Sequence, residues 1–83
     1  MVKVLFFAAL RERLGCEQYL LSCDDTKLDV AAVLNQLQSL NSKWQQELSR
    51  SDLLCAVNQQ LVPLTTQVRS GDELAFFPPV TGG

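Results

Sequence analysis

The sequence predicts an α+β roll, in which one main helix crosses a mixed sheet of about five strands and short helical pieces complete the fold. Three observations support this class. Short runs of β-forming residues open and close the chain, apolar residues recur at helical spacing in its middle, and turn-forming residues separate further short apolar runs. Because the chain has 83 residues and 47% hydrophobic content, we expect one domain over residues 1–83 with a single small core.

Residues 2–8 are the first predicted strand, because the run is short and rich in β-forming side chains. Side chains alternate between the two faces of a strand, so Lys3 marks a face that is partly exposed to water. Leu5 and Phe7 share the face of this lysine, whereas Phe6 points to the core side.

A short helical turn and a second strand follow. Leu10 and Leu14 have the spacing of neighbours on a helix, and Gly15 is typical of a helix end. Residues 17–23 read as the second strand, and their closeness to the first strand favours a hairpin.

The main helix is predicted to begin after Asp29, which is a good N-cap residue. It is expected to end at Asn41, and Trp44 and Leu48 indicate a second short helical piece. The apolar stripe that should face the sheet consists of Val30, Val33, Leu34, Leu37 and Leu40.

Three strands are expected in the last third of the chain. Residues 53–57 form a near-continuous apolar run and are predicted to be a central strand. Leu61 opens a short strand that Pro63 stops, and residues 73–77 form the last strand. Glu73 marks the outer face of that strand, which places Phe77 on the same face.

The chain ends in a stretch that predicts a functional tail over residues 78–83. Pro78 and Pro79 stop the last strand and favour a stiff, extended exit from the fold. The four residues after them can reach roughly 13 Å when extended. Gly82 and Gly83 have no Cβ and can enter a narrow channel, so the α-carboxylate of Gly83 is the group that such a tail presents to chemistry elsewhere.

Three stretches of the sequence carry a resemblance to a known family. They are residues 71–83 (GDELAFFPPVTGG), residues 3–8 (KVLFFA) and residues 56–59 (AVNQ), and the region from residue 16 to residue 51 matches in pattern only. Together they resemble the small, sulfur-carrier subunit of molybdopterin synthase, the MoaD family. The resemblance implies a ubiquitin-like β-grasp fold, in which the first and last strands are neighbours.

The same resemblance implies a role in molybdenum cofactor biosynthesis. Gly83 would be adenylated, converted to a thiocarboxylate, and used to donate sulfur to cyclic pyranopterin monophosphate, which builds the dithiolene. Gly82 would have a steric role, and Val80 and Thr81 would contact the partner's groove. The carrier would be no enzyme on its own but the small subunit of a sulfurtransferase. This fits a chain without histidine, the commonest general base.

Two partners are implied by the resemblance. One is an adenylating enzyme similar to the E1 of ubiquitin (MoeB-type), which uses ATP. The other is the large subunit of molybdopterin synthase (MoaE-type), with which the chain would form a heterotetramer. We expect Phe7 and Phe77 to form a docking patch for these partners, joined by Leu61, because clustered exposed apolar residues mark partner sites.

Composition argues against several other classes. We expect no metal site, because Cys16, Cys23 and Cys55 show no metal-binding spacing; they read as reduced cytosolic thiols that pack as small hydrophobes. A net charge of −2 with scattered basic residues predicts no nucleic-acid binding. The apolar run near the start is too short to span a membrane and does not read as a signal peptide, so we expect a cytoplasmic protein. The resemblance implies no cofactor bound by this chain, because ATP is used by the activating partner.

Three alternatives remain open at this stage. A sulfur carrier of the thiamine pathway would share the fold and the Gly-Gly end, although residues 76–81 resemble the molybdopterin branch. A ubiquitin-like protein modifier would share the activation step and then form isopeptide bonds. A plain interaction module would have no chemistry at the tail.

Overall fold

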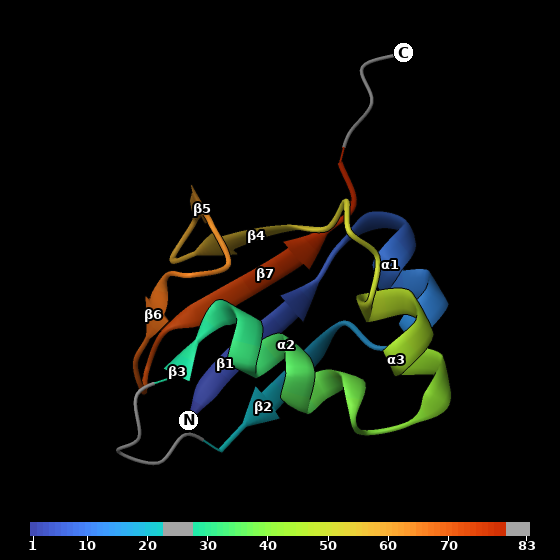
Figure 1. The fold of residues 1–83 in the computed structure, drawn as a ribbon, viewed down its shortest axis with the longest axis horizontal. Helices are drawn as coiled ribbons and strands as arrows, with labels where there is room; N and C mark the ends of the chain where they lie inside the picture. The colour runs from blue at the N-terminus through green and yellow to red at the C-terminus, as the bar shows by residue number, and fades with distance from the viewer. Residues whose placement is uncertain (23–27, 80–83) are drawn as a thin grey trace.

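The computed structural model describes residues 1–22 and 28–79, which form a five-stranded sheet, a two-stranded sheet and three helices. Figure 1 shows their arrangement. The elements are β1 (Val2–Phe6), α1 (Ala8–Leu14), β2 (Gln18–Leu21), β3 (Leu28–Asp29), α2 (Val30–Gln38), α3 (Ser42–Leu48), β4 (Leu54–Val57), β5 (Gln60–Val62), β6 (Gln67–Val68) and β7 (Glu73–Phe77).

The main sheet has the strand order β2-β1-β7-β4-β5. β1 and β7 pair in parallel, and the other pairs are antiparallel, so the predicted mixed sheet of five strands is confirmed. β4, which begins one residue after the predicted start, lies inside the sheet, but β7 is the central strand. A continuous apolar run indicates a strand that is buried between neighbours, and it does not tell which interior strand is the middle one.

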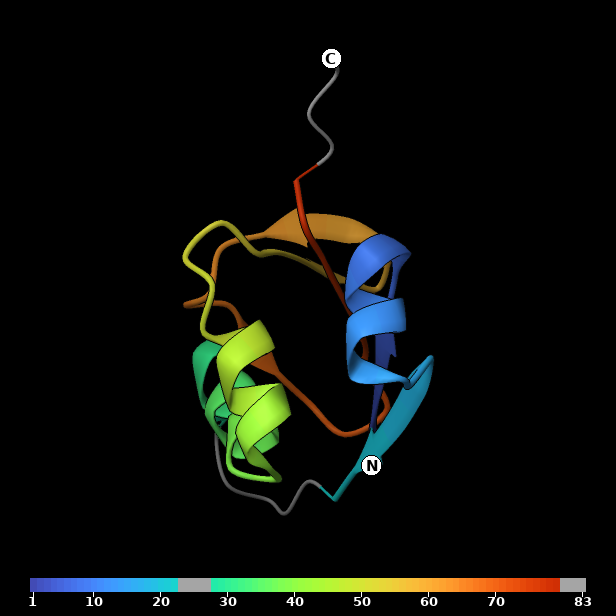
Figure 2. The same ribbon diagram turned by 90° about the vertical axis from the view of Figure 1, so that its right-hand side faces the viewer.

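The core lies between the inner face of the sheet and the helices. Figure 2 shows α2 and α3 together on one side of the sheet. α1 lies beside β1, and β2 lies near the C-terminal end of α1. Phe6 and Phe76 are fully buried, and their ring centroids lie 6.4 Å apart. The ring of Trp44 on α3 meets Phe6 edge-on at 5.3 Å, so the predicted second helical piece packs against the core. Burying each of these large side chains contributes about 1.5–3 kcal/mol to folding.

Helix boundaries follow the capping chemistry of the sequence. α1 ends at Gly15, whose left-handed φ of 65° is accessible to glycine without strain. The N-cap Asp29 begins α2 by accepting a hydrogen bond from the N–H of Ala32 at 2.7 Å. Asn41 does not end α2 as predicted; its Oδ1 accepts from the N–H of Trp44 at 2.9 Å and begins α3. α2 has already ended at Gln38, which leaves Leu40 outside the stripe and 44% exposed.

The sequence did not predict the small sheet formed by β3 and β6. Each of these strands has two residues, which is too short for an alternating pattern to appear. The loop before β6 also completes the start of α2: the carbonyl oxygens of Thr66 and Leu64 accept from the N–H groups of Val30 and Ala31, each at 3.0 Å. Among the described residues, no helix is long and apolar enough to cross a membrane.

Candidate functional site

The candidate site begins where β7 leaves the sheet. β7 ends at Phe77, and Pro78 and Pro79, which follow, are half-buried. Because a proline has no N–H to donate, the ladder cannot continue beyond this point. The predicted tail residues Val80, Thr81, Gly82 and Gly83 lie outside the described residues. The structure therefore describes the root of the tail.

Phe7 and Phe77 directly follow the last two residues that are paired between β1 and β7. Phe6 is opposite Phe76 in the parallel ladder, and the N–H of Phe7 donates to the carbonyl oxygen of Phe76 at 3.2 Å. Phe7 is 46% exposed and Phe77 is half-buried. Each of the two aromatic residues therefore directly follows one member of the Phe6–Phe76 pair, at the root of the tail.

The predicted first strand is two residues too long. β1 ends at Phe6, and Phe7 is the N-cap of α1 instead of a strand residue. The turn takes place at Ala8, which has a φ of 57°. Such a left-handed conformation costs a non-glycine residue roughly 1–2 kcal/mol, but it directs α1 so that Leu10 and Leu14 reach the core.

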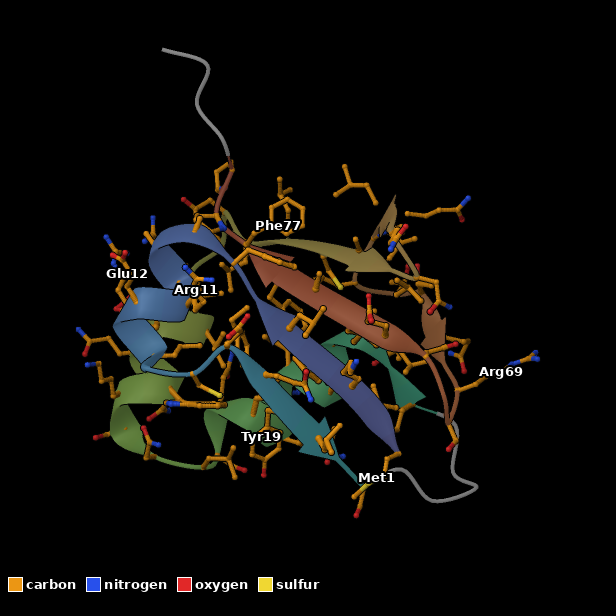
Figure 3. All side chains as sticks on the ribbon, turned by 180° about the vertical axis from the view of Figure 1, so that it is seen from behind. Met1, Arg11, Glu12, Tyr19, Arg69 and Phe77 are labelled. Carbon is orange, nitrogen blue, oxygen red and sulfur yellow. The ribbon has the colours of Figure 1, made fainter. Side chains whose placement is uncertain are left out.

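Leu61 lies on the same face of the sheet as Phe77 but not beside it. Leu61 is opposite Ala56 in the β4–β5 pair. It belongs to the edge strand β5, and its side chain is 65% exposed. Figure 3 shows this face, which we call the outer face, with no helix in front of β7 and β4 and with Phe77 near the end of β7. No helix of the described chain therefore covers the predicted docking residues.

The sequence predicted three docking residues on the outer face, Phe7, Leu61 and Phe77. Four further residues of this face were not predicted to take part in docking. Leu5, Ala75, Ala56 and Leu54 are all half-buried and alternate with core residues on β1, β7 and β4. The alternation already assigns Leu5 and Ala75 to the outer face. Which of them lie side by side depends on the register between strands, which a single sequence does not contain.

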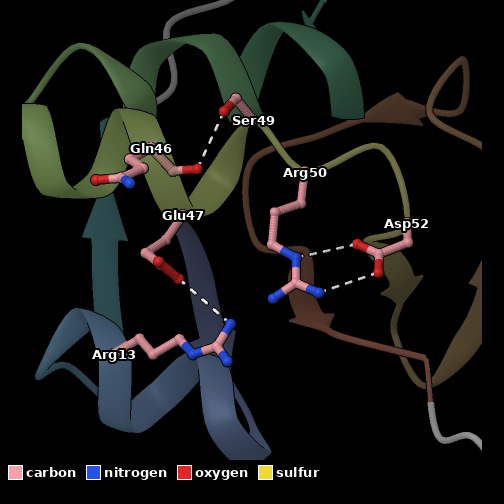
Figure 4. Close-up of polar contacts among 6 residues, drawn as sticks. All are labelled: Arg13, Gln46, Glu47, Ser49, Arg50 and Asp52. Atoms are coloured by element: carbon pink, nitrogen blue, oxygen red, sulfur yellow. Dashed lines mark hydrogen bonds and ion pairs between the residues drawn. The ribbon is translucent and has the colours of Figure 1, made fainter.

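Charged side chains lie beside the loop that leads into β4. Figure 4 shows Arg13 of α1 next to Glu47 of α3, 3.5 Å apart, and Arg50 next to Asp52. Two hydrogen bonds of 3.2 and 3.1 Å join Arg50 to Asp52 and hold the pKa of that carboxyl below its usual value. Both groups are solvent-exposed, so the pair contributes little to stability. Asp52 lies two residues before Leu54, which is opposite Phe77 at the start of β4.

No catalytic or metal-binding constellation is evident in the described part of the chain. Among residues 1–22 and 28–79, no group of three or more His, Cys, Asp or Glu side chains could hold a metal ion. Cys55 is 2% exposed, and burial raises the pKa of its thiol to about 11. The thiol of Cys16 is half-buried and donates to the carbonyl oxygen of Gln18 at 3.2 Å. The raised pKa of Cys55 is the opposite of what a nucleophilic cysteine requires.

Comparison with known proteins identifies the family. Residues 4–83 match the model of the ThiS family. The chain belongs to the ThiS family. This ThiS-family chain is 46% identical over 83 residues to the molybdopterin synthase sulfur carrier subunit of Haemophilus influenzae, and 41% identical to that of Escherichia coli. In both comparisons each protein is covered over 100% of its length.

Solved structures show the same fold. SAMP1 from Haloferax volcanii superimposes with a TM-score of 0.82 at 25% identity, covering 99% of this ThiS-family chain and 98% of SAMP1. A complex of subunits 1 and 2 of molybdopterin-converting factor from Helicobacter pylori matches with a TM-score of 0.69 at 26% identity, with coverage of 99% and 97%. The ubiquitin-like β-grasp fold that the resemblance implies is thereby confirmed.

Proposed function

We propose that the chain is the sulfur carrier subunit of a molybdopterin synthase and has no catalytic activity of its own. The observation that carries the proposal is the full-length identity of 46% and 41% to two bacterial proteins with that name. The architecture supports it, because the central strand β7 runs directly into the C-terminal segment. A strand held by two neighbours gives such a segment a fixed starting point.

The α-carboxylate of Gly83 is the reacting group in this proposal. A carboxylate is a poor acyl donor because oxide is a poor leaving group. Attack of the carboxylate on ATP forms an acyl-adenylate and releases pyrophosphate. The sulfur of a persulfide then displaces AMP, and a thiol cleaves the resulting S–S bond to leave a terminal thiocarboxylate. An adenylating enzyme similar to the E1 of ubiquitin (MoeB-type) would carry out the ATP-dependent step.

The second partner is the large subunit of molybdopterin synthase (MoaE-type), in a heterotetramer. Its pocket would receive the tail, with Gly82 allowing close passage and Val80 and Thr81 making extended contacts. The thiocarboxylate of Gly83 would then donate its sulfur to cyclic pyranopterin monophosphate. Aromatic side chains on the outer face, next to the tail's root, support a docked complex because such residues often anchor interfaces.

The intact mass of the chain tests this proposal. The protein is incubated with ATP, a sulfur source and the activating enzyme of the same cell, and its mass is then measured. Replacement of one oxygen by sulfur at the C-terminus is expected. A carrier that the enzyme preparation is known to modify serves as the positive control. If that carrier gains sulfur and the mass of this chain stays unchanged, the result contradicts the proposal.

A second candidate function is protein modification. It is favoured by the match to SAMP1 from Haloferax volcanii, because related solved structures are named small archaeal modifier proteins. A modifier would form an isopeptide bond between Gly83 and a lysine of another protein. The same incubation distinguishes the two functions: a modifier adds its own mass to other proteins, whereas a carrier gains sulfur.

A further inference from the structure

The side chains of the outer face differ in size, and two alanines lie at its centre. Ala75 of β7 and Ala56 of β4 are directly opposite each other across the antiparallel pair, and both are half-buried. In the same row, Leu5 of β1 flanks Ala75 and Leu61 of β5 flanks Ala56. We refer to Ala56 and Ala75 as the alanine pair.

Large side chains also border the alanine pair on the side of the tail. Phe77 and Leu54 form the next row of the outer face in that direction. On the opposite side lie Glu73 and Asn58, which are joined by a hydrogen bond of 3.1 Å from the N–H of Glu73 to Asn58 Oδ1. Side chains stand roughly perpendicular to a sheet, and an alanine ends at Cβ. The side-chain layer is therefore thinnest at the alanine pair, and its surroundings are apolar on three sides.

Sheet stability does not account for these alanines. Alanine is depleted in strands, and opposed pairs of aromatic or β-branched residues stabilise a sheet relative to an alanine pair. The pair faces away from α2 and α3, so no helix packing limits the size of its side chains. A requirement for space on the outer side remains as the physical reason for two small residues at this position.

We propose that the alanine pair receives one large apolar side chain of the large subunit and thereby selects this partner. The inference rests on the proposed function, because the partner that takes up the tail must surround its root. The pair lies one row from Phe77, roughly 7 Å along β7, and is therefore covered by such a partner. A polar group would lose its water against these neighbours without gaining a hydrogen bond, which is unfavourable. An aliphatic or aromatic side chain has no hydrogen bonds to water to lose and can be buried there without this cost.

The test fills the space without touching the core. Ala75→Leu and Ala56→Leu are prepared as single variants, with Gln18→Leu as the matched control. Gln18 lies in the same row, opposite Leu5 on the edge strand β2, so this variant adds a leucine to the outer face away from the alanine pair. Affinity for the purified large subunit is measured by calorimetry, and thermal melting reports on folding.

We expect each alanine variant to bind the large subunit about tenfold more weakly or worse, as for overpacking in an interface. Their melting temperatures should equal or exceed that of the unmodified protein, because leucine adds cross-strand contact. Gln18→Leu should bind within about twofold of the unmodified protein. Replacing the apolar side chain of the large subunit that faces the pair by alanine should restore binding to Ala75→Leu.

Three results would overturn the inference. Unchanged affinity of both alanine variants would show that nothing occupies the space. Weakened binding to the activating enzyme alone would assign the surface to that enzyme. Loss of a concentration-dependent dimer, without an effect on the large subunit, would assign it to a second copy of this chain. If the unmodified protein neither binds the large subunit nor gains sulfur, the proposed function fails as well, which distinguishes that case from the other three.

Discussion

Phe6 and Phe76 are opposite each other in the parallel pair of β1 and β7, with their rings stacked 6.4 Å apart in the core. The residues that follow them along the chain, Phe7 and Phe77, lie on the other side of the sheet. One register therefore places one aromatic pair inside the protein and a second pair at the root of the tail. Because side chains alternate with a period of two, a shift of β1 by one residue would turn Phe6 outward and Phe7 inward and break both pairs.

This arrangement predicts a separation between folding and binding. Phe7→Ala and Phe77→Ala should each weaken association with the large subunit by more than about 1 kcal/mol, because aromatic anchors often dominate interfaces. Phe76→Ala should instead destabilise the fold by about 3–5 kcal/mol. Leu20→Ala is the control, since Leu20 is 50% exposed and neighbours Lys3 at the far end of the same face. Calorimetric binding and thermal melting give the two readouts. Unchanged binding of both Phe7→Ala and Phe77→Ala would contradict the docking patch.

The hairpin between β4 and β5 offers a gain in stability. Asn58 and Gln59 have φ values of 49° and 71°, the left-handed pair that a two-residue hairpin turn requires. Asn58 holds its conformation with hydrogen bonds to Asp72 and Glu73. No hydrogen bond involves the side chain of Gln59 in the described structure. Gln59→Gly should therefore raise the free energy of unfolding by up to about 1 kcal/mol, measured by urea denaturation.

The neighbouring residue supplies the control for this variant. Gln60 is the first residue of β5, where glycine has no conformational advantage and weakens a strand. Gln60→Gly should lower the free energy of unfolding by roughly 0.5–1 kcal/mol. If both glycine variants lower stability equally, the left-handed conformation at residue 59 is not a source of strain.

Much of the fold could be predicted because its strands carry a clear period of two. In β7, Glu73 marks the outer side, and Leu74 and Phe76 are fully buried as that alternation requires. The parallel pairing of β1 with β7 could not be derived in this way. It joins residues about 70 positions apart. The family resemblance implied that the two strands are neighbours, and the structure gives their parallel direction.

The error at the end of the main helix arises from competition between local hydrogen bonds. Leu40 fits the helical spacing of α2, yet it is 44% exposed because α2 ends at Gln38 and Asn41 starts a new helix. The end of one helix and the start of the next both depend on the backbone group with which a polar side chain forms a hydrogen bond. The candidate site could also be predicted only in part. The tail could be predicted from the sequence, whereas the neighbours of the alanine pair depend on the register between strands.

The buried thiol of Cys55 predicts a dependence of stability on pH. Burial raises its pKa from 9.0 to about 11, so the folded state favours the neutral thiol. The resulting stability is fully present below pH 9, where the thiol is neutral in both states. It is lost as the pH rises from about 9 to 11, because the unfolded state then releases a proton more readily, at up to about 1.4 kcal/mol per pH unit.

Comparison with Cys55→Ala isolates this effect, because the other titrating groups are the same in both proteins. The alanine variant should be less stable at pH 8, since it leaves a small cavity in the core. The difference in free energy of unfolding should narrow between pH 9 and pH 10.5 in urea denaturation. A constant difference over that range would mean that the thiol is not held neutral by the fold.

The cysteines should be dispensable for sulfur transfer. Cys55 is buried, Cys16 is half-buried, and Cys23, which lies outside the described residues, precedes two aspartates that disfavour a thiolate. A variant with serine at all three positions should still gain sulfur at its C-terminus in the intact-mass assay, with some loss of stability. If it folds normally, as judged by circular dichroism, and gains no sulfur, the sulfur passes through a side-chain persulfide instead of the tail.

The length of the tail should control the rate of sulfur transfer. The proposed reacting group is the α-carboxylate of Gly83, and one added residue moves it by about 3.5 Å. Such a displacement can cost on the order of a hundredfold in rate even when binding is retained. Deleting Gly83 retracts the carboxylate by the same step, and Gly82→Val adds a β-branched side chain where a narrow channel is expected.

All three tail variants should melt like the unmodified protein, because β7 and the core end at Phe77. The extension and the deletion of Gly83 should also retain most of the affinity for the large subunit through the outer face, since the docking patch is unchanged. The rate of sulfur transfer to the pterin precursor is measured for each variant, with mass spectrometry to exclude trimming. An untrimmed one-residue extension that carries and delivers sulfur at the normal rate would falsify the assignment of the terminal carboxylate as the reacting group.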